Sequence, residues 1–219
     1  MGRVIPFVVR RVADVEPASK ERKWLVENLW LAGGVGILGG APKVCKTFLA
    51  AEISVAVATG SRVLGCDALL TGPVLFYGAE DSLPELRTRF EGLVTVRNLT
   101  VEQLPIYLLD IPTLRLERDE DLGRLRAAVA QYQPRLLVLD PFVRIARVDE
   151  NSAADVSGVL ASLRAIQREL DVAVLLVHHA RKSPAAHPNQ SLRGSSDFAA
   201  WSDSNLYLTR RQNVLTLTI

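Results

Sequence analysis

A glycine-rich stretch, GGAPKVCKTFLA at residues 39–50, constrains the fold more than any other part of the chain. It follows a short apolar run, VGILGG at 35–40, and it leads into an alanine-rich segment that ends at Gly60. An apolar run of this length is typical of a buried strand, and a glycine just past an apolar segment is typical of a helix end. The sequence therefore predicts a strand, a tight loop and a helix in direct succession.

The loop matches the phosphate-binding pattern G-x-x-x-x-G-K-[ST] at every position but one. Cys45 stands where the second glycine belongs, a residue that tolerates positive φ and lets a backbone N–H approach a phosphate. Holding cysteine there costs on the order of 1–2 kcal/mol, against about 8 kcal/mol for micromolar nucleotide binding. We therefore expect a nucleotide site weakened roughly ten- to thirtyfold, the alternative being a plain turn. The expected phosphate cradle comprises Gly40, Ala41, Pro42, Lys43, Val44, Cys45, Lys46 and Thr47.

The rest of the chain alternates short apolar runs with amphipathic segments. Such alternation predicts an α/β fold with a mostly parallel, twisted sheet flanked by helices on both faces. Two last apolar runs, SNLYLTRR and NVLTLTI, predict a C-terminal antiparallel hairpin at a sheet edge. We expect further strands at 73–81, 105–110, 135–141 and 172–179, and helices at 84–98, 119–132 and 152–170.

Length and composition indicate one domain. The 219 residues are 48% hydrophobic, enough for a large single core, and residues 1–23 form a polar leader before an ordered domain at 24–219. Because the chain stops inside a predicted strand, the natural protein has room to extend past Ile219. A net charge of +2 gives no global basic field, so any nucleic-acid contact has to be local.

The chain shows no sign of secretion or membrane insertion. The N-terminus has no apolar region of signal-peptide length, and no apolar stretch reaches the ~20 residues of a membrane span. Cys45 and Cys66 are too few for a disulfide framework. We expect a cytoplasmic protein with no membrane partner.

A carboxylate ends one of the predicted strands. In LLVLD, four apolar residues precede Asp140, which places the acid at the C-terminal tip of a buried strand. An acid there holds Mg²⁺ beside the hydroxyl of a phosphate-binding loop, here that of Thr47. LLVLDP alone fits equally well a carboxylate that caps the next turn. The loop upstream favours the metal.

Two other strand ends carry polar side chains. Glu80, in YGAEDS, is the candidate base for a water that attacks a γ-phosphate, and Asp81 is expected to cap the next helix, unless both acids only cap. His179, in VHHARKS, is expected to contact the γ-phosphate. Zinc is not expected, because His187 is the only third imidazole and no cysteine is near.

Taken in order, these stretches resemble the RecA-like ATPases, and within them the hexameric replicative helicases of the plasmid RepA type, close to the DnaB-like group. The matching stretches are GGAPKVCKT, YGAEDS, LLVLDP, LLVHHARKS and LRGSSDFAAWSDSNLYLTRR, across roughly residues 30 to 212. Five motifs in order are far more specific than one. The resemblance implies a RecA-like P-loop NTPase core and a homo-oligomeric ring, as in the hexamers, with ATP sites between neighbours.

The resemblance also implies roles for single residues. Lys46 and Thr47 would bind the phosphates of ATP, and Thr47 with Asp140, the Walker B acid, would hold Mg²⁺. Glu80 would be the catalytic base, and His179 would sense the γ-phosphate. Cys45 departs from the family pattern at the loop itself, and no N-terminal partner-binding domain is recognisable.

In this family an arginine from the adjacent subunit stabilises the charge of the transition state. Arg210 best matches that position, with Arg211 and Arg193 as rivals. The stretch after the sensor histidine resembles the DNA-contacting loop, where Arg181, Lys182 and Arg193 would follow a single-stranded DNA backbone without reading its sequence. The alternative for this stretch is a solvated surface loop.

Three functions are compatible with the sequence. The first is a Mg²⁺-dependent, ATP-hydrolysing motor domain that acts on single-stranded DNA as a replicative helicase does. The second is a nucleotide-binding regulatory or scaffold module with slow or no hydrolysis. The third, a small-molecule kinase, is disfavoured by the paired histidines and the RGSS segment.

Overall fold

The computed structural model describes residues 8–16, 23–148, 152–179 and 195–219. Within these ranges a seven-stranded sheet has the order β5-β4-β6-β7-β3-β8-β9, and β1 and β2 form a separate two-stranded ribbon. The strands are β1 Trp24–Val26, β2 Trp30–Leu31, β3 Val35–Gly40, β4 Val74–Gly78, β5 Ile106–Leu108, β6 Leu136–Asp140, β7 Ala173–His179, β8 Ser204–Arg211 and β9 Val214–Thr218. The helices are α1 Lys46–Thr59, α2 Leu83–Thr95, α3 Asp119–Tyr132, α4 Phe142–Ile145, α5 Ala153–Leu170 and α6 Ser195–Trp201, with short 3₁₀ turns η1 Val12–Asp14 and η2 Val101–Gln103.

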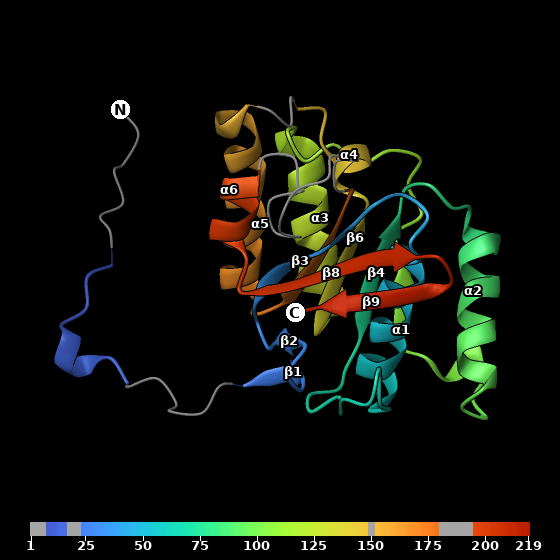
Figure 1. Cartoon of the computed structure of the whole chain (residues 1–219). Helices are drawn as coiled ribbons and strands as arrows, with labels where there is room; N and C mark the ends of the chain where they lie inside the picture. The colour runs from blue at the N-terminus through green and yellow to red at the C-terminus, as the bar shows by residue number, and fades with distance from the viewer. Residues whose placement is uncertain (1–7, 17–22, 149–151, 180–194) are drawn as a thin grey trace.

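Helices cover both faces of the sheet, as Figure 1 shows. One hydrophobic cluster joins the sheet to α1, α2 and the β1-β2 ribbon, and a second joins it to α3, α4, α5 and α6. In the seven-stranded sheet, all neighbouring strands from β5 to β8 run parallel, and β9 pairs antiparallel with β8. The predicted α/β sheet and its C-terminal hairpin are therefore confirmed.

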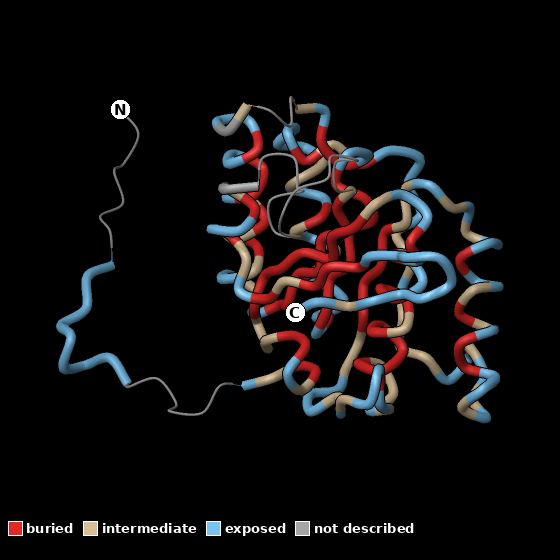
Figure 2. The backbone as a smooth tube through the Cα atoms, in the orientation of Figure 1, coloured by how far each residue is buried: buried red, intermediate tan, exposed pale blue. Residues whose placement is uncertain are grey.

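The central strands are apolar throughout because both of their faces are covered. In β6, Leu136 and Val138 pack into the first cluster, whereas Leu137 and Leu139 pack into the second. Successive side chains of a strand point to opposite faces, so a continuous apolar run is what a doubly covered strand needs. Figure 2 shows this buried centre as a red band crossing the molecule.

The segments predicted as amphipathic form helices that bury one face. Val156, Val159, Leu163 and Ile166 of α5 are all buried on the sheet side. In α3 the buried stripe is narrower, because Tyr132 stays 38% exposed and lies at a tilt against Tyr107 of β5, with a distance of 4.5 Å between the ring centroids.

The sequence did not predict the β1-β2 ribbon, α4 or α6, which are short. The expectation that Asp81 caps the next helix is wrong. The cap of α2 is Ser82, whose hydroxyl accepts the Glu85 N–H while the Glu85 carboxylate accepts the Ser82 N–H at 2.8 Å. This reciprocal capping box satisfies two backbone donors at once, which a single aspartate does not do. Asp81 instead pairs with Arg89 at 2.9 Å.

The C-terminal hairpin is built into the sheet through β8, which lies between β3 and β9. Gly36 permits this close pairing, because a Cβ there would lie 2.1 Å from the Ser204 carbonyl oxygen. Figure 2 shows β9 and the described N-terminal residues 8–16 as largely exposed. In the parts of the chain that the structure describes, no helix combines the length and apolarity needed to cross a bilayer.

Candidate active site

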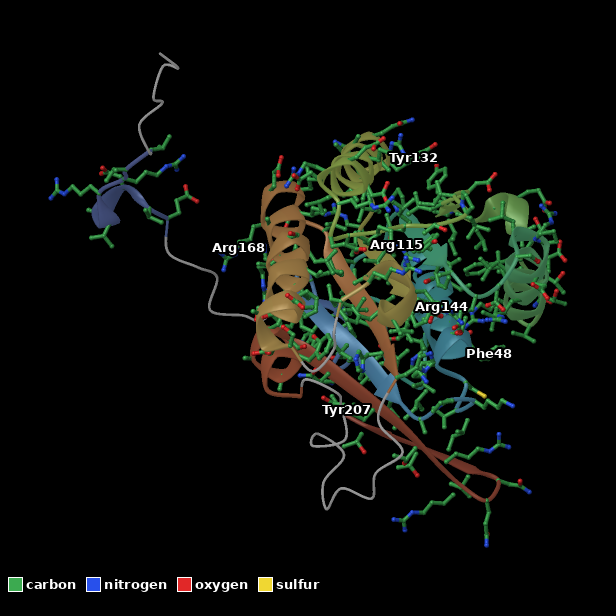
Figure 3. The ribbon with its side chains drawn as sticks, turned by 90° about the horizontal axis from the view of Figure 1, so that it is seen from above. Phe48, Arg115, Tyr132, Arg144, Arg168 and Tyr207 are labelled. Carbon is green, nitrogen blue, oxygen red and sulfur yellow. The ribbon has the colours of Figure 1, made fainter. Side chains whose placement is uncertain are left out.

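Four strands end together at one edge of the sheet. The register pairs Gly78 of β4 with Asp140 of β6, and Gly40 of β3 with His179 of β7. Because these strands are parallel neighbours, the residues just past their ends share one edge, the usual ligand-binding edge of an open α/β sheet. Figure 3 shows the molecule from above, with Phe48 of α1 and Arg144 of α4 labelled.

The loop between β3 and α1 has the backbone of a phosphate cradle. Cys45 adopts φ 66° and ψ 28°, the left-handed conformation that glycine takes without strain, as the sequence pattern requires. Its side chain is exposed and makes no capping hydrogen bond to α1. Gly40 is fixed by packing, since a Cβ there would lie 2.5 Å from the Leu208 carbonyl oxygen. Because Cys45 does not cap α1, the first N–H groups of this helix are left to bind an anion.

Lys46 begins α1, and its side chain turns back over the loop. The ammonium donates to the carbonyl oxygens of Gly40 at 3.0 Å and of Ala41 at 2.8 Å. Lys46 is only 5% exposed. Burial lowers the pKa of Lys46, while the negative charges of Asp140 and Glu80 oppose that change. The lysine and the two acids therefore act on one another across a shared site.

Asp140 is the buried acid of the site. It is 4% exposed, and burial raises its pKa from 3.8 to about 6, although a hydrogen bond from the Thr47 hydroxyl opposes this. Its Oδ2 is buried and has no hydrogen-bond partner among the described residues. A buried carboxylate oxygen beside a hydroxyl is a suitable ligand for a hard cation.

Glu80 is the exposed acid of the site. Its side chain is 47% exposed, and Oε1 accepts from Nε of Arg144 at 2.9 Å. Arg144 lies on α4, the short helix that follows Asp140 and Pro141. Arg144 was not predicted as a site residue, because it stands at no motif position and α4 itself was not predicted.

The two histidines at the end of β7 have different surroundings. His178 is buried beside the rings of Phe198, 4.4 Å away, and Phe142, 5.9 Å away. His179 is half-buried, and burial together with the charge of Lys46 lowers its pKa. A neutral imidazole near the lysine is therefore expected at neutral pH, and its Nδ1 is buried with no partner within the described part of the chain.

The structure describes two of the other cationic residues singled out in the sequence, Arg210 and Arg211. Arg210 lies on β8, is exposed, and donates from Nε to the Gln212 carbonyl oxygen at 3.2 Å. Its rival Arg211 is exposed on the same strand. The three residues expected to contact nucleic acid, Arg181, Lys182 and Arg193, lie outside the described residues.

A family model described as an AAA domain matches residues 6–185. The chain belongs to this AAA family. It is thus an ATP-binding P-loop ATPase domain, and the match includes the strand ends that carry Lys46, Glu80, Asp140 and His179. The hairpin with Arg210 lies beyond the matched residues.

The residues of the AAA domain fit a magnesium ion. Mg²⁺ keeps several waters and takes few protein ligands, which suits one carboxylate and one hydroxyl better than a full protein cage. Asp140 Oδ2 and the Thr47 hydroxyl provide that pair. Across the described residues no group of three or more His, Cys, Asp or Glu side chains is arranged to hold a metal.

Proposed function

We propose that this AAA domain is a Mg²⁺-dependent, ATP-hydrolysing motor domain of a RecA-like oligomer that acts on single-stranded DNA, as replicative helicases of the RepA and DnaB type do. One observation carries the proposal. Lys46, Glu80, Asp140 and His179 lie at or just after the ends of four parallel strands, whose register brings those ends to one edge of the sheet. The charges of Lys46 and Glu80 also contribute to the pKa shifts of Asp140 and His179. This is the arrangement that phosphoryl transfer to water needs.

Each residue has a distinct task in this proposal. Lys46 and the N–H groups of α1 bind the β- and γ-phosphates, and Thr47 and Asp140 hold Mg²⁺. When bound there, Mg²⁺ would supply positive charge against the phosphate oxygens. Glu80 orients the attacking water and accepts its proton, for which a half-exposed carboxylate is well placed. His179, kept neutral by its burial and by the charge of Lys46, donates a ring N–H to the γ-phosphate.

The oligomer and the DNA are supported by sequence resemblance and by one structural feature. Arg210 is exposed on a hairpin at the edge of the sheet and so is available to a neighbouring subunit. We propose that it supplies positive charge to the neighbour's ATP site, with Arg211 and Arg193 as alternatives. Arg181, Lys182 and Arg193 are proposed to contact the DNA backbone.

A second function is favoured by two observations. Cys45 holds a strained conformation in the phosphate loop, and Glu80 is ion-paired to Arg144. The first weakens nucleotide binding and the second restrains the base. A nucleotide-binding regulatory or scaffold module with slow or no hydrolysis would show both features.

Steady-state ATP hydrolysis with and without an oligo-dT of about 20 nucleotides, together with particle mass by light scattering, separates the two functions. A motor gives turnover that the oligonucleotide stimulates and an assembly larger than the monomer. Glu80→Gln should then lose turnover but still bind ATP, while Lys46→Ala loses binding. Arg87→Gln, which removes an exposed, ion-paired arginine from α2, is the matched control. ATP binding without stimulated turnover in the unmodified protein would favour the regulatory module.

A further inference from the structure

A polar cavity of about 350 Å³ lies beside Glu80. Two of its walls, the connection from β5 to α3 and the helix α4, contain none of the motifs discussed above. Figure 3 shows Arg115 and Arg144 from these two walls near one another in the view from above. The lining consists of Tyr77, Ala79 and Glu80 after β4, Pro112, Thr113 and Arg115 before α3, and Arg144 of α4.

The walls of the cavity are held in place by hydrogen bonds to the backbone. The Leu114 N–H donates to the Tyr77 hydroxyl at 3.2 Å, and the Arg115 N–H donates to Asp121 at 2.9 Å. Nη1 of Arg115 donates to the Arg144 carbonyl oxygen at 2.6 Å, which joins the two walls. The position of Arg115 is therefore set before any ligand enters.

The cavity carries more positive than negative charge. Its ionised lining residues are two arginines and one glutamate. Within the described residues, hydrogen bonds from these guanidinium groups use only Nη1 of Arg115 and Nε of Arg144. The other N–H groups remain to bind an anion, and the planar fork of arginine matches phosphate oxygens.

We propose that this cavity binds a phosphate-type oxyanion, and that the anion competes with Glu80 for Arg144. The anion is either a phosphodiester of single-stranded DNA or the inorganic phosphate that hydrolysis releases, since both present the same oxygens. When the anion binds Arg144, the Glu80 carboxylate is released from its ion pair. The effect of this release on catalysis rests on the proposed function of Glu80 as the base. Binding of the anion does not depend on that function.

The test measures phosphate binding without involving the phosphate loop. In the Lys46→Ala protein, which has lost the loop's lysine, inorganic phosphate is titrated by calorimetry. Adding Arg115→Gln or Arg144→Gln should weaken phosphate binding about tenfold or more, because each removes a charge-assisted hydrogen bond. Adding Arg87→Gln should leave the affinity unchanged. Glu80→Gln should strengthen binding, since it removes both the competitor for Arg144 and the negative charge in the cavity.

The opposite signs expected for Arg144→Gln and Glu80→Gln make the test specific. No phosphate binding in the Lys46→Ala protein, or equal affinity in the Arg115, Arg144 and Arg87 variants, would overturn the proposal. An oligo-dT titration followed by fluorescence anisotropy identifies the source of the anion. If phosphate and the labelled oligonucleotide compete for binding, the source of the anion is DNA. If they do not compete, the source is the phosphate released by hydrolysis. ATP turnover is not used here, so failure of the motor function would leave this result interpretable.

Discussion

The two acids of the site lie at the ends of neighbouring strands, yet their surroundings differ sharply. Asp140 is 4% exposed, accepts a hydrogen bond from Thr47 and has a raised pKa. Glu80 has a side chain that is 47% exposed and forms an ion pair with an arginine that is 62% exposed. The first position is set by the packed core, and the second by an exposed ion pair that a ligand can exchange. This contrast suits a fixed metal ligand beside a base whose availability changes.

The largest expected effect is on turnover, where the two acids should fail in different ways. Asp140→Asn and Glu80→Gln should each lower kcat by about 10²–10⁴-fold, the usual range for losing a general base or a comparable charged group. Only Asp140→Asn should also abolish the strengthening of ATP binding by Mg²⁺, because only it removes a proposed ligand. Parallel ATP titrations in Mg²⁺ and in EDTA would measure this. An equal loss of Mg²⁺ dependence in both variants would contradict the division of roles.

The next largest effect is on the free energy of unfolding, and here replacing the two acids should have effects of different size. The pKa of Asp140 is raised in the folded state to about 6 from an ordinary 3.8, so folding is favoured most when the acid is protonated. Burying the ionised carboxylate therefore costs folding free energy. This cost is absent below about pH 4, grows as the pH rises toward 6, and is constant above pH 6. Two pKa units correspond to about 3 kcal/mol. Without metal, Asp140→Asn should therefore gain up to about 3 kcal/mol at pH 8 and nothing at pH 4.

Denaturant unfolding in EDTA at both pH values would measure this gain. Glu80→Gln is the matched control, because it neutralises the other acid and should change stability by less than about 1 kcal/mol, the range of an exposed ion pair. If Asp140→Asn is no more stable than the unmodified protein at pH 8, the acid is better solvated than its burial indicates.

The same contrast explains how much of the site could be predicted from the sequence. Asp140 follows four apolar residues of a strand that is covered on both faces. The apolar run therefore predicts that Asp140 is buried and that it lies at the end of that strand. The parallel sheet follows from the same runs. Arg144 could not be found in this way, because its partner Glu80 is 64 residues away and the two meet only once β4 and β6 pair. Arg115 also lies beside Glu80, but it comes from the irregular connection between β5 and α3, which has no periodic sequence pattern.

The capping error has a similar origin. Asp81 and Ser82 are adjacent, and both are good capping residues, so composition does not separate them. The deciding residue is Glu85, three positions after Ser82, which completes the capping box. That signal was present in the sequence, and an S-x-x-E search would have found it.

Substitutions of Cys45 would measure how much its left-handed backbone conformation weakens nucleotide binding at the loop. Cys45→Gly should remove strain of about 1–2 kcal/mol and strengthen nucleotide binding by roughly ten- to thirtyfold. Cys45→Ala separates strain from the thiol, since alanine keeps the same unfavourable positive φ and should not strengthen binding. Equilibrium binding of a fluorescent ATP analogue would measure both. Equal affinities for the glycine variant and the unmodified protein would show that the loop relieves the strain at Cys45 in another way.

The smallest expected effects are on stability, from removing the contacts of the two residues that follow Glu80. The segment after Glu80 enters α2 through the Ser82 capping box, while Asp81 makes only a partly exposed pair with Arg89. Ser82→Ala should cost about 1 kcal/mol of stability, the usual effect of losing a cap, and Asp81→Asn should cost about 0.2–1 kcal/mol. Denaturant unfolding at pH 7 would rank the two. Because Asp81 also raises the pKa of Asp140 through its negative charge, Asp81→Asn should lower that pKa, which offsets part of the lost ion pair. A larger loss for Asp81→Asn than for Ser82→Ala would mean that the exposed side of the site depends on its ion pairs more than on its helix cap.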